Sequence, residues 1–547
     1  MVTIQDPTPA AREPSEAPAP LRLPLAGPGP AADDVGAATR RGVLFIPMAK
    51  LWFLVAGLVM QLLLPRALGS AALFGMWTLV LGWLSVVNNV LIQATIQSVA
   101  HFAAAGPKAL DDAKRTALQV NLRLGLGIAA AFFLAAPLVA SFEHDAELIP
   151  HLRLATGVIV AYSFYAVFVG AANGARQFHK QAALDMTFST LRAGLVLAAA
   201  LTFHATLPAV GGFVLAAGLI MVLSIGVVGM PRPGQSPPGA MRQMLSYMGW
   251  LMLYMAAINA LMFLDGWWLK RLCTEAASHT GLAAAEVKRS VDALVGVYAA
   301  AQTVARLPYQ LILAVAFIIF PLLSTPALRA DKARTRRYIE TTLRYSLVVM
   351  VAMVAGIGVR PQATLRLLYP AEYSTGASAF AILLGAYVCF SLLCIVGTIT
   401  NSLGRALPTA LLGILTALLT CGAVYLSIQN GLAGGDPPLR AAALGLLVGM
   451  GGGLVLNLAY LWRCLQVTLP PLSLLRAGVG FAAVMALGRV WPEPGTPGLL
   501  GSKLGTLVCA GLASLLYVGV LMVLRELSLR ELMLLRRDRP AASAEVG

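Results

Sequence analysis

The sequence predicts an all-α polytopic membrane protein with about 14 transmembrane helices, arranged as two six-helix lobes plus two additional C-terminal helices. Composition is the first reason: 58% of the 547 residues are hydrophobic and 12% are charged, whereas soluble domains carry about 25% charged residues. The second is that apolar runs recur along the chain, each near the roughly 20 residues that cross a bilayer core. The third is an internal repeat: residues 72–77 read ALFGMW, and residues 293–298, 221 positions later, read ALVGVY.

The chain divides into five regions. Residues 1–39 are rich in Pro and Ala and poor in aromatic residues, so we expect a disordered cytosolic tail. The N-terminal lobe (helices 1–6) then spans 40–230, the C-terminal lobe (helices 7–12) 231–465, two additional helices 466–526, and a basic cytosolic tail 527–547. Hydropathy places the membrane spans near 42–64, 72–97, 117–140, 152–174, 183–203, 207–229, 245–269, 291–320, 338–358, 377–400, 406–428, 440–464, 471–490 and 501–524.

Charged loops set the orientation of these spans. Lys and Arg concentrate in alternate loops and in the C-terminal tail, so the positive-inside rule places both termini in the cytosol. Topology therefore explains the formal net charge of +16, and nucleic-acid binding is not expected. One outer loop holds Glu143, His144, Asp145 and Glu147. Residues of these types bind divalent ions in other proteins, but nothing fixes their geometry here, and we expect a solvated loop.

Further landmarks of the repeat occur in order. The spans after the two six-residue stretches begin near Ala117 and Tyr338, again 221 residues apart, and the fourth and tenth spans end at Asn173 and Asn401, each shortly before an arginine. Ordered landmarks with a slowly drifting offset indicate duplication. Six membrane crossings separate the copies, so both halves have the same topology. This predicts a pseudo-two-fold axis along the membrane normal, a substrate site between the lobes, and a transporter.

Several short motifs resemble those of a known family. Residues 66–69 (RALG) and 74–75 (FG), after the first span, are similar to a hairpin of O-antigen and polysaccharide flippases. Residues 264–266 (LDG), 296–301 (GVYAAA) and 320–324 (FPLLS) are similar to the same family. The chain therefore resembles the oligosaccharide-flippase branch of the superfamily that also contains multidrug antiporters and the peptidoglycan-precursor flippase. The similarity extends over about residues 40–465.

The resemblance implies a function and a location. It implies a V-shaped central cavity and transfer, by alternating access, of an undecaprenyl-diphosphate-linked oligosaccharide to the periplasmic leaflet of a bacterial inner membrane. The carried glycan would be an O-antigen or exopolysaccharide repeat unit. The expected partners are this lipid-linked oligosaccharide, membrane lipids and a glycan polymerase or other assembly machinery. No cofactor is expected: the six cysteines lack metal-binding spacing, and no phosphate-binding GxxxxGK[ST] motif for ATP is present.

Charged residues within spans are the main candidates for the site. Arg192 and Arg306 lie near the middle of the fifth and eighth spans, where a charge costs about 2.5–3.5 kcal/mol. A guanidinium binds phosphate oxygens in pairs, so we expect both to face the cavity and hold the diphosphate. The alternative is that each pairs with a buried carbonyl or acid. Asp265, toward the outer end of the seventh span, is expected to pair with Arg306, take up a coupling proton, or reach the outer interface.

Amides within the spans are the next candidates. Asn88, Asn89, Asn259 and Gln302 are placed to bind sugar hydroxyls from the cavity wall. The alternative role for each is a hydrogen bond between helices.

Two other functions remain open. One is a cation-coupled multidrug or metabolite antiporter of the same fold, although sites for cations favour acids and aromatic rings, and the charges within these spans are mainly basic. The other is a membrane glycosyltransferase or glycan polymerase, which needs acids placed for sugar chemistry. The outer loops are short and their acids scattered, so we do not expect an enzyme.

Overall fold

A computed structural model describes residues 32–104, 106–279, 281–310, 332–403, 405–492, 496 and 501–526, and within them the chain is helical with no strand. Residues 1–31 of the predicted disordered leader, the whole basic tail (527–547), residues 311–320 of the eighth span and the 320–324 motif lie outside this part of the chain, whereas residues 32–39 of the leader are helical and belong to the first helix. The elements are α1 (Ala32–Leu68), α2 (Ala71–Ala103), α3 (Pro107–Val120), the π-helical turn η1 (Asn121–Gly125), α4 (Leu126–Phe142), α5 (Leu148–Gly174), α6 (Phe178–Phe203), α7 (Thr206–Val228), α8 (Ala240–Ala260), α9 (Leu264–Ser278), α10 (Ala284–Ala305), α13 (Lys332–Gly358), α14 (Pro361–Leu368), the 3-10 turn η2 (Ala371–Gly376), α15 (Ala377–Ser402), α16 (Ala406–Gly434), α17 (Pro438–Leu465), α18 (Pro471–Val490) and α19 (Lys503–Val523).

The predicted multi-pass membrane fold is confirmed. In the described residues, 12 helices are long and apolar enough to cross a membrane, or 13 if α8 and α9 form one bent span. Many leucine and valine side chains on their outer faces are exposed, as expected where lipid replaces water. Of the 14 predicted spans, the eighth is described only in part.

The predicted seventh span is interrupted. Its two helices, α8 and α9, meet at an angle of 51° across Leu261–Phe263. The apolar run continues through this break, so hydropathy does not reveal it. Broken helices inside a membrane protein leave backbone carbonyls that need partners, and one of these, the carbonyl of Met262, accepts a hydrogen bond from the Arg306 guanidinium.

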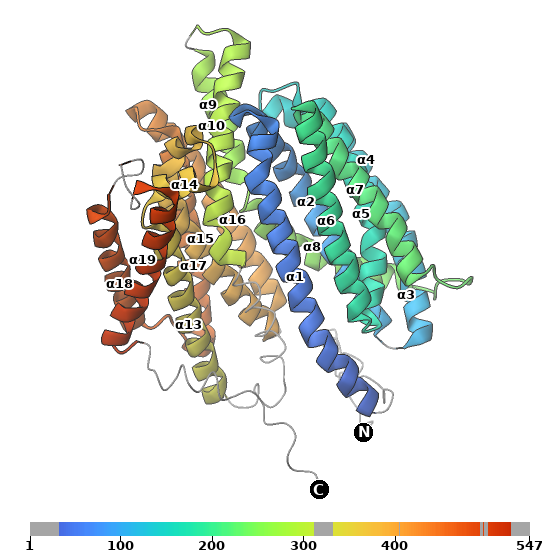
Figure 1. Cartoon of the computed structure of the whole chain (residues 1–547). Helices are drawn as coiled ribbons and strands as arrows, with labels where there is room; N and C mark the ends of the chain where they lie inside the picture. The colour runs from blue at the N-terminus through green and yellow to red at the C-terminus, as the bar shows by residue number, and fades with distance from the viewer. Residues whose placement is uncertain are drawn as a thin grey trace, which may run out of the picture.

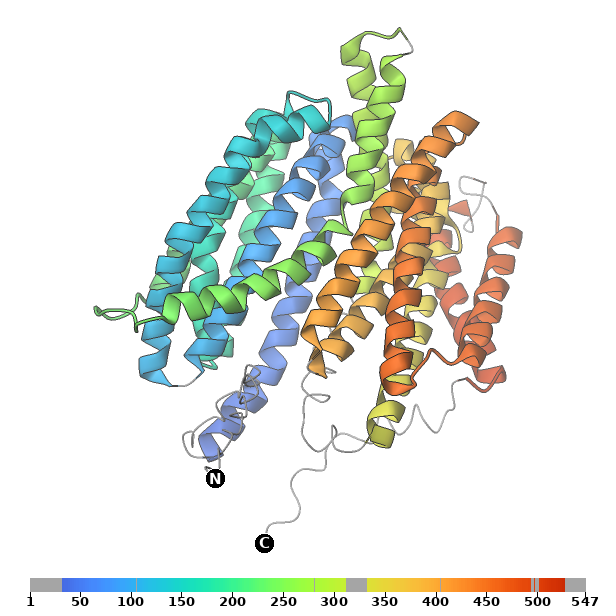
Figure 2. The ribbon, with the colours of Figure 1, turned by 180° about the vertical axis from the view of Figure 1, so that it is seen from behind.

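The helices form two bundles (Figure 1). The N-terminal bundle is α1–α7, in which α1 packs on α6, α2 on α5, and α7 on both α5 and α6. The C-terminal bundle is α8–α10 and α13–α17; α8 and α9 pack on α16, α10 on α15, and α17 on both α15 and α16. Seen from behind, α8 runs obliquely toward α3 (Figure 2). The same set of helix pairs therefore recurs in both halves, as expected for duplicated units.

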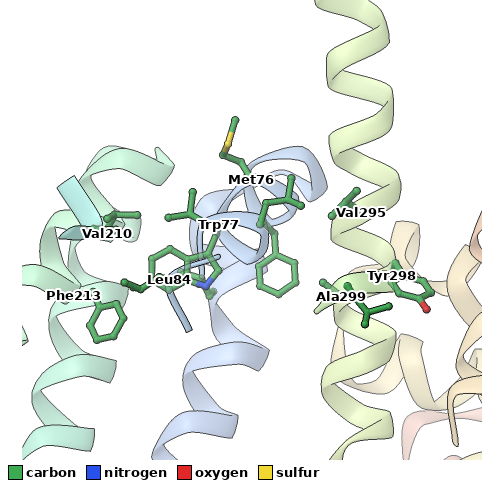
Figure 3. Packing of buried hydrophobic residues seen from close by; sticks show 14 of the residues in the cluster. Met76, Trp77, Leu84, Val210, Phe213, Val295, Tyr298 and Ala299 are labelled. Atoms are coloured by element: carbon green, nitrogen blue, oxygen red, sulfur yellow. The ribbon is translucent and has the colours of Figure 1, made fainter. Parts of the chain in front are cut away.

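The two similar stretches of the sequence, residues 72–77 and 293–298, contact each other where α2 crosses α10. A Cβ atom built on Gly75 would lie 2.0 Å from the Asp292 carbonyl oxygen, and one built on Gly296 would lie 2.0 Å from the Ala71 carbonyl oxygen. Each glycine thus abuts the carbonyl four residues before the other, a reciprocal contact typical of a two-fold axis. Figure 3 shows the packing around this crossing, with Met76, Trp77 and Leu84 of α2, Val295, Tyr298 and Ala299 of α10, and Val210 and Phe213 of α7.

The two C-terminal helices, α18 and α19, pack on each other and on α13. Just after α19, Glu526 accepts hydrogen bonds from Arg344 Nε of α13 at 2.7 Å and Arg476 Nη1 of α18 at 2.8 Å. Its side chain is fully buried. A buried carboxylate is stable only when it is paired in this way, so Glu526 joins α18 and α19 to the rest of the C-terminal half.

Candidate functional site

A buried polar cluster surrounds the break between α8 and α9. Asp265, in the first turn of α9, is completely buried; its Oδ2 accepts hydrogen bonds from the Tyr298 hydroxyl at 2.8 Å and from Gln302 Nε2 at 2.6 Å. Arg306, directly after α10, donates from Nε to the Tyr387 hydroxyl at 2.7 Å. Its Nη2 donates to Gln302 Oε1 at 3.3 Å and to the main chain in the break.

Gln302 is the bridge of this cluster, because its amide nitrogen serves Asp265 and its amide oxygen serves Arg306. No direct ion pair within 4.0 Å joins these two charges in the described structure. The Arg306 guanidinium also lies over the rings of Phe263 and Tyr387, with its central carbon 5.2 and 5.4 Å from the two ring centres. A carboxylate and a guanidinium linked through an amide are electrostatically coupled, so a proton or cation arriving at one alters the other.

Arg192 lies midway along α6, among aromatic rings of the N-terminal bundle. Its guanidinium carbon is 5.2 Å from the ring centre of Phe53 on α1, 5.5 Å from Phe188 on α6 and 5.8 Å from Phe213 on α7. Its buried Nε finds no hydrogen-bond partner among the described side chains. Gly57 of α1 lies beside it: a Cβ there would approach Arg192 Nη2 to 3.4 Å.

The predicted amides divide into three environments. Asn89 of α2 donates from Nδ2 to Oδ1 of Asn259 of α8 at 3.1 Å, so this pair joins the two bundles. Asn88 is buried in α2, and its Oδ1 lacks a partner within the described structure. Gln302 belongs to the Asp265 cluster.

The structure thus brings together Asp265, Gln302 and Arg306, and separately Asn89 and Asn259. Arg192 lies in the other bundle from Arg306, and a single cavity shared by both arginines stays a prediction. Two of the cluster's members, Tyr298 and Tyr387, were not predicted. Tyr298 was open to prediction, because Tyr298, Gln302 and Arg306 recur every four residues and so lie on one helical face. Tyr387 carries no such signal, since only the packing of α15 on α10 brings it close.

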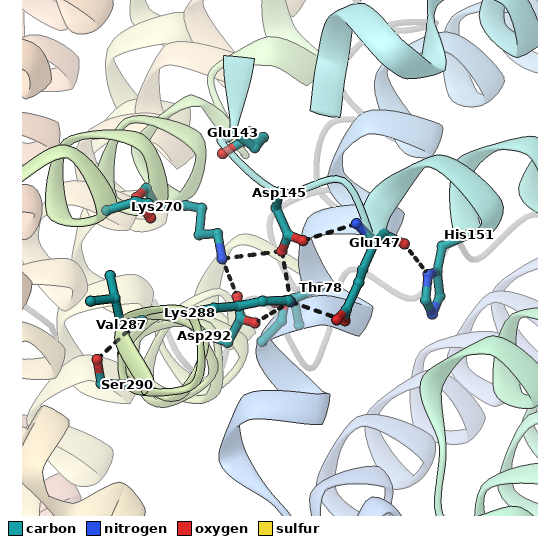
Figure 4. A network of polar contacts seen from close by, with 12 residues as sticks. Thr78, Glu143, Asp145, Glu147, His151, Lys270, Val287, Lys288, Ser290 and Asp292 are labelled. Carbon is teal, nitrogen blue, oxygen red and sulfur yellow. Dashed lines mark hydrogen bonds and ion pairs between the residues drawn. The ribbon is translucent and has the colours of Figure 1, made fainter. Parts of the chain in front are cut away.

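The expectation of a solvated loop between α4 and α5 is wrong for two of its acids. The Glu143 side chain is fully buried and Asp145 nearly so. Trp83 Nε1 donates to Glu143 Oε1 at 2.9 Å; burial raises the pKa of Glu143 to about 8, and this hydrogen bond only partly offsets the rise. Burial alone would raise the pKa of Asp145 as well, but Lys270 and Lys288 outweigh it and lower that pKa. The reason is tertiary packing: α9 and α10 cover this loop (Figure 4).

Trp267 of α9 makes an aromatic contact with the other bundle. Its ring stacks on Trp83 of α2, with ring centres 4.0 Å apart and an interplanar angle of 15°. It therefore contributes to the contact between the two bundles.

Solved structures with a similar arrangement of helices include a flippase and a multidrug transporter. A structure described as the lipid II flippase MurJ in an inward closed conformation matches with a TM-score of 0.68 at 12% identity, covering 90% of this chain and all of that chain. Inward-facing and outward-facing structures of a multidrug resistance MATE family transporter of the MOP superfamily each match with a TM-score of 0.54, at 14% and 15% identity. They cover 81% of this chain and 95% and 96% of their own. At these identities the similarity establishes the fold.

Comparison with curated protein sequences finds no match. A family model does match: residues 40–326 fit the model described as polysaccharide biosynthesis protein. The matched region begins just before the first span and includes α2, α6, the break between α8 and α9, and all of α10. It covers more than half of the chain. The protein therefore belongs to the polysaccharide biosynthesis protein family and, as its motifs predict, has the fold of the flippase and multidrug transporter superfamily.

Proposed function

We propose that this protein is a flippase that carries undecaprenyl-diphosphate-linked oligosaccharide, an O-antigen or exopolysaccharide repeat unit, from the cytosolic to the periplasmic leaflet of a bacterial inner membrane. Membership of the polysaccharide biosynthesis family supports a glycan substrate. The duplicated bundles support alternating access, since two similar units that meet along one interface are able to rock about a site between them. Both termini are cytosolic in this proposal, so the loop between α4 and α5 is periplasmic.

The observation that carries the proposal is the environment of the Arg192 guanidinium. Its charge lies midway along a membrane helix, its contacts are aromatic faces, and no acid pairs with it in the described structure. A cation in hydrocarbon surroundings is costly unless an anion reaches it. A diphosphate is such an anion, and a guanidinium with free N–H groups binds it through paired hydrogen bonds.

The remaining candidates take supporting roles in this proposal. Asn88, Asn89 and Asn259 lie at or near the α2–α8 contact and would bind sugar hydroxyls once the bundles separate. Arg306 and Gln302 already have partners, so they bind substrate only by exchanging those hydrogen bonds. We assign their cluster, with Asp265, primarily to energy coupling.

Reconstituted vesicles test the proposal. The full chain is inserted into liposomes that contain fluorescent undecaprenyl-diphosphate oligosaccharide, and transfer between leaflets is measured by the access of an added glycan-cleaving enzyme. Arg192→Ala should slow transfer by about 10- to 150-fold, because a hydrogen bond to a charged group contributes about 1.5–3 kcal/mol. Arg192→Lys should recover only part of the rate, since a lysine lacks the paired donors.

Arg153→Ala is the matched control. Arg153 also lies over an aromatic ring, that of Phe133 at 5.0 Å, but it is exposed on the outside of the N-terminal bundle. Its loss should leave transfer unchanged. Equal rates for the Arg192→Ala and wild-type proteins would refute the assignment of Arg192, and the absence of any protein-dependent transfer would refute the proposed function.

A second function, a cation-coupled exporter of small molecules, is favoured by one observation. Asp265 is a buried carboxylate held by a hydroxyl and an amide, and no basic side chain among the described residues pairs with it directly; a proton or metal cation can bind in such an environment. The two functions differ in substrate and share the coupling step. An exporter would move an aromatic cation across the same vesicles under an ion gradient and leave the lipid-linked oligosaccharide in place.

A further inference from the structure

Five charged side chains meet where the outer ends of the two bundles touch (Figure 4). The N-terminal bundle supplies Asp145 and Glu147 from the loop between α4 and α5. The C-terminal bundle supplies Lys270 of α9 and Lys288 and Asp292 of α10. The side chains of Lys270 and Asp145 are each 1% exposed and that of Asp292 is 5% exposed. These are buried charges, in contrast with ordinary surface ion pairs.

The two aspartates bond to the same two lysines from opposite bundles. Asp145 Oδ2 lies 3.3 Å from Lys270 Nζ and 2.9 Å from Lys288 Nζ. Asp292 pairs with Lys270 and, at 2.9 Å, with Lys288. Two cations and two anions therefore form a charge-balanced quartet. Glu147 adds a contact of 3.3 Å to Lys288 from a side chain that is 70% exposed.

Only the contacts of Asp145 and Glu147 cross between the bundles, because Asp292 and both lysines belong to the C-terminal bundle. If the outer ends separate, Asp145 leaves with the N-terminal bundle, and two lysines remain with one aspartate. Separation therefore breaks both ion pairs of Asp145 and unbalances the charge on each side. Buried pairs broken in this way are far more costly than exposed ones.

Other contacts close the same end. The Gly75–Gly296 crossing lies on the same face of α10 as Lys288 and Asp292, since the three α10 residues are four apart. Arg271 Nη1 of α9 donates to the Phe142 carbonyl of α4 at 2.8 Å. These contacts and the stacked indoles of α2 and α9 hold the outer ends together, and Asp145 supplies the charged component.

We propose that Asp145, Lys270, Lys288 and Asp292 form an outer latch, which holds this end of the transporter shut and must open before substrate leaves toward the periplasm. The latch rests on the alternating access of the proposed function. Asp145 is its detachable member, and Asp292 keeps the two lysines in place on the C-terminal bundle. In the closed latch the two lysines therefore have two anionic partners, Asp145 and Asp292. In the open latch they have only Asp292.

Distance measurement between spin labels tests the latch without any substrate. The labels are attached to cysteines at Ala146 and Ala276, which are exposed and lie beside the latch on opposite bundles, in a full-length background lacking the six native cysteines. The protein is reconstituted in lipid nanodiscs, and the distribution of label–label distances is recorded. Asp145→Asn should add a longer-distance population and raise the ratio of separated to joined molecules by about tenfold or more.

Asp292→Asn is the matched control, because it removes the same charge from the same quartet without cutting a contact between bundles. Its distribution should stay that of the parent protein or shift toward the joined form. Unchanged distances in Asp145→Asn, or equal widening in the two variants, would overturn the latch. If Asp145→Asn does not fold, Lys288→Gln is measured instead; it removes the 2.9 and 3.3 Å contacts to the N-terminal bundle and should widen the distances less strongly. No widening there would also overturn it.

Because no oligosaccharide is present, the distance result stands apart from the proposed function. A latch that opens as expected in a protein that moves no lipid-linked oligosaccharide would leave the latch intact and reject the substrate. Unchanged distances in a protein that moves the oligosaccharide would reject the latch and leave the proposed substrate intact.

Discussion

The glycine crossing between α2 and α10 gives a prediction whose size follows from the structure. An alanine at position 75 would place its Cβ 2.0 Å from the Asp292 carbonyl oxygen and 2.9 Å from the Gly296 nitrogen. Ordinary contacts between carbon and oxygen begin near 3.3 Å, so the two helices must move apart by about 1 Å or more. Overpacking of this kind costs about 1–3 kcal/mol. At 1.4 kcal/mol per factor of ten, Gly75→Ala should shift the bundles toward separation by about 5- to 150-fold.

The Ala146 and Ala276 spin labels report this shift. Gly218→Ala is the control, because a Cβ on that helical glycine of α7 would meet no atom within 4 Å. Gly296→Ala should act like Gly75→Ala, and the double variant should add little to either, because one alanine already moves the helices apart and gives the second room. Additive effects, or distances equal to those of Gly218→Ala, would refute the reciprocal crossing.

Two carboxylates outside the spans should make stability depend on pH in opposite directions. The pKa of Glu143 is raised from 4.5 to about 8, so its contribution is fully present below the unfolded pKa and is lost as pH rises through about 8. The unfolding temperature of the wild type should therefore fall over this pH range relative to that of Glu143→Gln. Parallel plots of unfolding temperature against pH for the two proteins would contradict the raised pKa. Burial tends to raise the pKa of Glu526, but Ser473 and its two arginines outweigh this and lower it. Its contribution is therefore present above the unfolded pKa and lost as pH falls through the folded value; Glu526→Gln should cost about 3–5 kcal/mol at neutral pH, seen as a lower unfolding temperature. Gln302→Leu should cost about 1–3 kcal/mol, because it leaves a carboxylate and a guanidinium each short of a partner. Thr303→Val loses a bond to its own helix and a contact with the Tyr369 hydroxyl but leaves no charged group short of a partner, so it should cost less, and equal losses would count against the bridge.

Apolar runs predict most of the helices closely, because a bilayer demands both length and apolarity of each span. The predicted span 471–490 coincides with α18 (Pro471–Val490), and 183–203 ends where α6 ends. The break between α8 and α9 escapes this reasoning, since residues 261–263 are as apolar as their neighbours. The repeat was readable from landmarks in the sequence. The direct contact of its two copies at Gly75 and Gly296 was not, because spacing along a chain carries no distance between helices.

The sequence predicts individual residues of the candidate site better than it predicts which of these residues contact each other. The cost of burying charge identifies Asp265 and Arg306 in the sequence, and the structure joins them through Gln302. The same reasoning finds Arg192 without indicating which helices surround it. Asp145 was misjudged because the sequence shows a charge in a short loop, whereas its burial depends on α9 and α10, more than a hundred residues away.

The central claim is that lipid-linked oligosaccharide crosses the membrane only when the outer ends of the two bundles can part. The most direct test is transfer of fluorescent undecaprenyl-diphosphate oligosaccharide by vesicles containing the Ala146→Cys, Ala276→Cys protein, before and after a reducible cross-linker joins the two cysteines. Transfer should occur in the unlinked protein, stop on cross-linking, and resume when the linker is reduced. Undiminished transfer by the fully cross-linked protein would contradict the claim.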